Sequence, residues 1–143
     1  MKKYPYTLFI SLVIAVLSLM PVPETPLNEI NFIDKWTHLL MYFGQTSAFW
    51  LDYCRQRGLR LFCSKAPFFV PRSLQVELMN RKHLLWGGLA FPIFWGGLME
   101  LLQAYCTNHM RSGDWVDWVA DALGSIIGYG FCALLVRLFF KRK

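Results

Sequence analysis

The chain has 143 residues, of which 55% are hydrophobic, 17% are aromatic and only 17% are charged. Soluble domains average about 45–50% apolar and about 25% charged residues, so this composition excludes a disordered chain and argues against an ordinary water-soluble enzyme. A surplus of apolar residues in a chain of this size is typical of a small membrane protein. We therefore expect a single membrane domain over residues 1–143.

Four apolar stretches approach the roughly 20 residues that a helix needs to cross a bilayer. They cover about residues 6–22, 35–51, 83–102 and 117–139. The first follows two lysines, as a signal peptide would, but no pair of small residues marks a cleavage site and three prolines follow it. We expect it to remain as a span. The predicted fold class is all-α, a polytopic membrane protein built as a bundle of four transmembrane helices.

The positions of the basic residues indicate how this bundle is oriented. Of the 15 Lys and Arg residues, 13 lie in the N-terminal segment, the loop 52–82 or the C-terminal tail. Basic loops stay on the cytoplasmic side, so we expect both termini inside and a multi-pass protein of the inner (cytoplasmic) membrane. The net charge of +6 then reflects contact with anionic membrane lipid, and no nucleic-acid partner is expected.

Polar residues interrupt three of the four apolar stretches. Ionisable side chains inside a membrane are costly, and they usually face a bundle interior or a wet cavity. The second span begins with Asp34 and Lys35. His38 lies four residues after Asp34 and Tyr42 four residues after His38, so these side chains share one helical face. The third span ends with a Glu-x-x-Gln pair, and an Arg and three Asp residues precede or open the fourth.

The predicted topology brings these polar sets to one depth. Spans two and four start on the outer side and span three ends there, so the three sets can share one pocket. The candidate ligand-binding residues of this pocket are Asp34, Lys35, His38, Tyr42, Glu100, Gln103, Arg111, Asp117 and Asp121. Each has a simpler explanation as well, because Asp residues often cap helix N-termini and a lone His is more often a packing residue. Gly124 and Gly128 form a GxxxG pair that serves either packing within the chain or a dimer, so the oligomeric state stays open.

Three motifs in this order resemble the VanZ-like family of integral membrane proteins over about residues 6–140. They are Asp34-Lys35-x-x-His38-x-x-x-Tyr42, then Glu100-x-x-Gln103, then Arg111 with Asp117, position 121, Gly124 and Gly128. The resemblance implies a four-helix envelope protein with a shared polar site, in a family associated with glycopeptide resistance. The family usually has Asn at position 121, so Asp121 adds a carboxylate beside Glu100 and the family's ligand preference does not transfer directly.

Three functions remain open at this point. The first is an accessory role in binding a lipid-linked or amphiphilic ligand, with Lys35 and Arg111 pairing with its anionic group. The second is a membrane enzyme acting on a lipid-linked envelope precursor, with His38 as a base oriented by Asp34 and Glu100 as an acid. The third is a polar network that only holds the helices together. No HxxxH or HExxH spacing is present, so neither a metal nor another cofactor is expected.

Overall fold

The computed structural model describes residues 4–20, 33–56, 80–106 and 114–139, and every regular element within them is a helix. The helices are α1 (Pro5–Leu19), α2 (Ile33–Gln56), α4 (Arg81–Leu85), the π-helical turn η2 (Trp86–Ala90), α5 (Phe91–Cys106) and α6 (Trp115–Phe139). The elements α4, η2 and α5 follow one another as one continuous helix. The predicted all-α class is confirmed, and each predicted span overlaps one helical unit.

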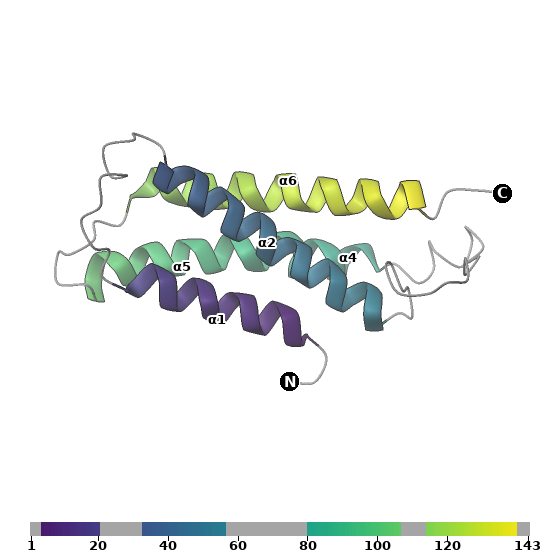
Figure 1. Ribbon diagram of the computed structural model, residues 1–143, viewed down its shortest axis with the longest axis horizontal. Coiled ribbons are helices and arrows are strands. Elements are labelled where there is room, and N and C mark those ends of the chain that lie inside the picture. The colour runs from purple at the N-terminus through teal and green to yellow at the C-terminus, as the bar shows by residue number, and fades with distance from the viewer. Residues whose placement is uncertain (1–3, 21–32, 57–79, 107–113, 140–143) are drawn as a thin grey trace.

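The helices lie side by side with their ends in two groups (Figure 1). Helix α2 packs most extensively on α6 and also on α1, and α5 packs on α6 and α1. The first residues of α2 and α6 lie at the same end of the bundle as the last residues of α1 and α5 (Figure 1). We call this the polar end, since the acidic residues at the starts of α2 and α6 and at the end of α5 meet there. The opposite end is the basic end.

Glycines bring α2 and α6 into direct backbone contact. Gly124 lies against the carbonyl group of Leu39, and a Cβ atom at Gly128 would be 3.1 Å from the carbonyl oxygen of Phe43. A side chain at either position would push the two helices apart. The GxxxG pair is therefore used for packing within the chain.

The π-helical turn has a local cause in Pro92. Proline has no amide hydrogen, so the carbonyl group of Gly88 cannot receive the usual bond from four residues ahead. Instead the backbone widens, and the Phe91 amide donates to the carbonyl oxygen of Trp86, five residues back. The ring of Phe49 packs against Gly87 in this turn. The close packing of Phe49 and the π turn therefore occur at the same place in the helix.

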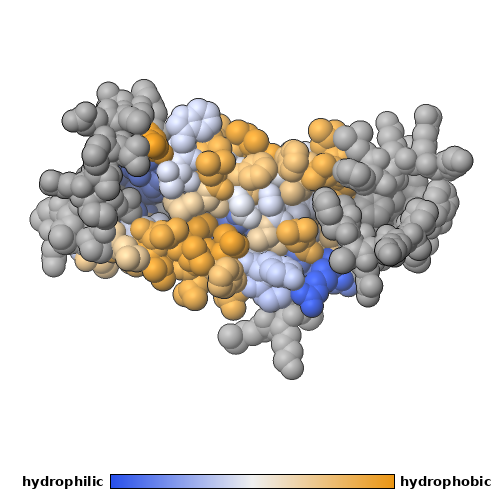
Figure 2. Space-filling view, in the orientation of Figure 1, coloured by the Kyte–Doolittle hydropathy of each residue, from blue (hydrophilic) through white to orange (hydrophobic). Residues whose placement is uncertain are grey.

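Two helical units are long and apolar enough to cross a membrane, judged by length and composition. They cover Arg81–Cys106 with 26 residues and Trp115–Arg137 with 23 residues. Helix α1 is apolar but has only 15 residues. Helix α2 has 24 residues, but its polar side chains make it less apolar than the two long helices. Many large apolar side chains are exposed, and Figure 2 shows them spread over the middle of one face. These features suggest membrane association.

Most predicted boundaries differ from the observed ones by a few residues, and the largest difference lies at the end of α2. The loop was expected to start at residue 52, but α2 continues to Gln56, so residues 52–56 are helical. Asp52 is fully buried, although the charge pattern had placed it in a cytoplasmic loop. Partners from α1, described below, explain its burial. The basic segment 57–79 lies outside the described residues.

Candidate ligand site at the polar end

Three ionisable side chains from three helices meet inside the polar end. The Nδ1 atom of His38 in α2 lies 2.9 Å from Oδ1 of Asp121 in α6, within a hydrogen bond. The same nitrogen lies 3.8 Å from Oε1 of Glu100 in α5. The exposed fractions are 3% for His38, 7% for Glu100 and zero for Asp121, so all three groups are removed from solvent. The expected convergence of the three helices on one polar cluster is observed.

The neighbours of Asp121 hold its carboxylate in place. Gly96 of α5 faces it, and a Cβ atom built on Gly96 would be 2.6 Å from Oδ2 of Asp121. Ser125 is also fully buried, and its hydroxyl donates to the backbone carbonyl of Asp121. The absence of a side chain at position 96 is thus what allows a carboxylate to fit between α5 and α6.

A second group of charges surrounds the first at the helix starts. Lys35 forms an ion pair with Asp117, with Nζ 3.1 Å from Oδ1, and a longer one with Asp114 at 3.5 Å. Asp114 also caps α6, because its Oδ1 accepts from the amide of Val116. Its own amide donates to Oε2 of Glu100 over 3.0 Å. The capping explanation therefore holds for Asp114, whereas Asp117 binds Lys35.

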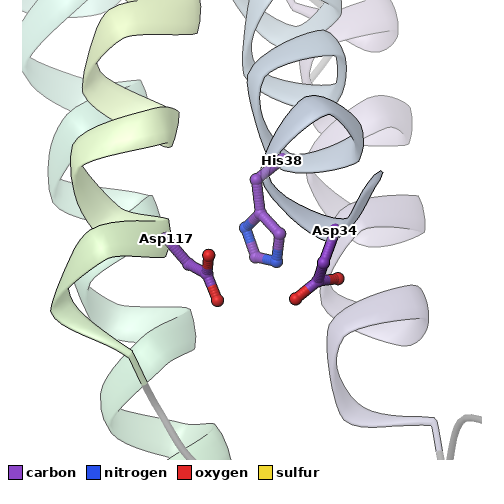
Figure 3. Close-up of side chains that lie close together, drawn as sticks. All are labelled: Asp34, His38 and Asp117. Atoms are coloured by element: carbon purple, nitrogen blue, oxygen red, sulfur yellow. The ribbon is translucent and has the colours of Figure 1, made fainter. Parts of the chain in front are cut away.

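Asp34 completes the outer part of this arrangement. Figure 3 shows the ring of His38 between the carboxylates of Asp34 and Asp117. One ligand-type atom from each of these three residues lies within 4.8 Å of the others, and Asp34 is exposed while the other two are buried. The exposed carboxylate of Asp34 therefore lies beside the buried imidazole.

The remaining predicted site residues have different positions. Gln103 donates to the backbone carbonyl of Ser18 and so joins α5 to the last turn of α1. Tyr42 is 1% exposed and packs with Ile14 and Met99, and its hydroxyl has no hydrogen-bond partner among the described residues. Arg111 lies outside the described residues. The ligand-binding role of all these residues stays a prediction.

An apolar groove lies beside the cluster on the outer surface of α2 and α6. Its lining comprises Lys35, Trp36, Leu39, Val116, Val119, Ala120 and Leu123. Lys35 is the only charged residue in this lining, and its side chain is 31% exposed. The groove therefore combines apolar walls with one partly exposed lysine at the polar end, which is ion-paired with Asp117 and Asp114.

A second buried polar network lies nearer the basic end, and the sequence analysis missed it. Oδ2 of Asp52 accepts hydrogen bonds from both the amide and the hydroxyl of Thr7 in α1, at 2.8 and 2.9 Å. Gln45 donates to the hydroxyl of Ser11, which in turn donates to the Thr7 carbonyl. The signal was present in the sequence. Thr7, Ser11 and Ser18 are spaced by four and seven residues, on one face of an otherwise apolar helix.

No protein-family model, no curated protein and no solved structure matches the chain. The resemblance to the VanZ-like family therefore stays a prediction that depends on the three motifs.

Proposed function

We propose that the chain is a multi-pass protein of the inner membrane, with a VanZ-like four-span topology, whose polar end binds an amphiphile with an anionic headgroup. The observation that carries the proposal is the apolar groove between α2 and α6 with Lys35 at its rim. A lipid-linked envelope precursor is an amphiphile of this kind. The acyl or isoprenyl chain would lie along the groove, and the headgroup would reach the polar end.

The distribution of exposed side chains supports placement in a membrane. In each of the two long apolar helices, only 33% of the most apolar window is buried inside the structure. A core helix of a soluble protein would be mostly buried. The outward-facing residues include Phe9, Leu12, Trp86 and Phe94, with exposed fractions from 63% to 73%. Such an apolar surface is unfavourable in water and favourable in contact with lipid.

The described cations support the proposed orientation. Four of the five lie at the basic end, namely Arg55, Arg81, Lys82 and Arg137, and only Lys35 lies at the polar end. The positive-inside rule would place the basic end in the cytoplasm and the polar end outside. Three exposed tryptophans, Trp36, Trp115 and Trp118, lie at the polar end, at the level where aromatic side chains favour the membrane interface.

The enzyme alternative has one observation in its favour, the hydrogen bond between His38 and Asp121. A carboxylate that fixes an imidazole is a common feature of acid–base catalysis. However, a general base must reach its substrate within hydrogen-bond distance, and His38 is 3% exposed while Asp121 is fully buried. The accessible groove therefore favours binding.

The test measures binding of a fluorescent single-chain alkyl phosphate to the purified full chain in detergent. The alkyl alcohol of the same chain length serves as the comparison ligand. We expect the phosphate to bind more tightly than the alcohol. Lys35→Ala should weaken phosphate binding by about tenfold or more, because it removes one charge-assisted contact.

The matched control is Lys82→Ala, which removes an exposed lysine from the other end of the bundle. It should leave binding unchanged. Leu123→Trp fills the groove from a position that is 48% exposed and should weaken binding of both ligands. Equal affinities of Lys35→Ala and Lys82→Ala for the phosphate would show that the proposal is wrong.

A further inference from the structure

We propose that His38, Glu100 and Asp121 form a binding site for a divalent first-row transition metal ion, with Mn²⁺ and Zn²⁺ as the best candidates. The site goes beyond the proposed binding of an amphiphile and does not depend on it. It uses the buried face of the polar end, whereas the groove lies on the outer surface.

The geometry of the three side chains fits one ion. One ligand-type atom from each residue lies within 4.8 Å of the other two, and the closest pair, His38 Nδ1 and Asp121 Oδ1, is 2.9 Å apart. Ligand atoms held at about 2.0–2.2 Å from a common ion lie about 3–3.5 Å from one another. Oε1 of Glu100 lies 3.8 Å from Nδ1 of His38, so its carboxylate has to shift towards the ion. The ion would replace the hydrogen bond between His38 and Asp121.

Two carboxylate oxygens in this cluster are buried without a hydrogen bond from any described residue. They are Oε1 of Glu100 and Oδ2 of Asp121. A buried carboxylate oxygen without a donor is costly, and structures normally satisfy it with a partner. A cation bound by Oε1 of Glu100 and by both oxygens of Asp121 would satisfy the two oxygens at once.

The charge balance also favours a cation over an anion in this position. Five carboxylates gather at the polar end, from Asp34, Glu100, Asp114, Asp117 and Asp121. The described groups that balance them are Lys35, already paired with Asp117 and Asp114, and the imidazole of His38. One divalent ion would offset part of the remaining negative charge.

The surroundings of His38 match those of a metal ligand. Metal-bound imidazoles usually present their second nitrogen to a carboxylate, which fixes the ring and increases its basicity. The ring of His38 lies between the carboxylates of Asp34 and Asp117 (Figure 3). One imidazole with two carboxylates suits Mn²⁺ and Zn²⁺ better than Mg²⁺, which prefers oxygen ligands and bound water.

The expectation of no metal came from the absence of a local ligand motif. Here each ligand belongs to a different helix, and 83 residues separate His38 from Asp121. No short spacing can reveal such a site.

The test is a titration of Mn²⁺ into the EDTA-treated full chain in detergent, followed by electron paramagnetic resonance. Mn²⁺ avoids the thiolates that would bind Zn²⁺. We expect one ion per chain and a rise in Tm. Asp121→Asn and Glu100→Gln preserve side-chain volume and should each weaken binding by at least about tenfold, because even an outer-shell carboxylate contributes about 10–100-fold.

Asp52→Asn is the matched control, because Asp52 is an equally buried carboxylate at a distance from the cluster. It should bind Mn²⁺ like the parent, and so should Leu123→Trp, which affects only the amphiphile groove. Melting curves without metal would show that each variant is folded. The proposal is overturned if the folded parent binds no Mn²⁺, if Asp121→Asn binds it as tightly as the parent, or if Mg²⁺ competes equally.

Discussion

Gly96 and Asp121 fit against each other across the contact between α5 and α6, so that the missing side chain of one leaves the space that the carboxylate of the other occupies. This pair links the packing of the bundle to the geometry of the polar cluster. It also allows the cluster to be perturbed without changing any ionisable residue.

Gly96→Ala should therefore disturb the cluster. The added methyl group would lie 2.6 Å from Oδ2 and 3.0 Å from Cβ of Asp121, so the carboxylate has to move. Overpacking of this kind costs about 1–3 kcal/mol, and thermal melting should show it. Affinity for Mn²⁺ should fall as well. Gly130→Ala in α6 is the control, because its Cβ would meet nothing within 4 Å and alanine favours helices. A Tm for Gly96→Ala at or above that of Gly130→Ala would contradict the structure.

Gly124→Ala should destabilise the protein far more than Gly130→Ala, although both glycines lie in α6. Its methyl group would meet the backbone carbonyl of Leu39, and a helix backbone cannot move aside as a flexible side chain can. We expect α2 and α6 to separate and the amount of folded protein in the membrane to fall well below that of Gly130→Ala. Size-exclusion chromatography provides a second readout. If Gly124→Ala kept its stability and only dissociated a dimer, the assignment of this pair to packing within the chain would fail.

Asp52 allows a test of the second polar network. Both of its hydrogen bonds from Thr7 end on the same oxygen, Oδ2. Asn can provide that oxygen, so Asp52→Asn should remain folded. Asp52→Ala leaves the buried amide and hydroxyl of Thr7 without an acceptor, which should lower the free energy of unfolding by about 1–3 kcal/mol per unsatisfied group. Denaturation in detergent would compare the two variants. Equal loss in both would mean that the charge of Asp52, and not its acceptor oxygen, is what matters.

Thiol labelling tests the proposed orientation. Cys106 is exposed in the last turn of α5, whereas Cys54 and Cys132 are buried and should not react in the folded protein. A membrane-impermeant maleimide added to intact cells should therefore label Cys106 from outside. Cys106→Ser should abolish this labelling. Cys63 lies outside the described residues, and the topology predicts that it reacts only after the cells are opened. Labelling of intact cells that persists in Cys106→Ser would reverse the proposed orientation.

The convergence of the polar residues could be predicted because it follows from two regular properties of a helical bundle. Helical periodicity places Asp34, His38 and Tyr42 on one face, and the alternation of span direction brings the end of α5 to the starts of α2 and α6. Neither property requires knowledge of the partners in advance.

The burial of Asp52 could not be predicted in the same way. Counts of charged residues placed it with a basic loop, and its partner Thr7 lies 45 residues away on a helix whose rotation is set by packing. The close contact between Gly124 and the backbone of Leu39 likewise depends on the position of α6 along α2. Such contacts follow from the fit of complete helices, which short patterns do not encode.

The π turn at Trp86–Ala90 has a consequence for the whole third helical unit. Leu84 and Glu100 are both buried, although 16 residues at about 100° each would leave them about 160° apart around a regular α-helix. The wider turn takes up much of this angular difference, so one inner face runs from the aromatic packing near the basic end to the carboxylate at the polar end. Making the turn a regular α-helix without removing a residue would restore the separation of about 160° and direct either Leu84 or Glu100 outwards. A single irregular turn thus determines which side of the helix supplies the acid.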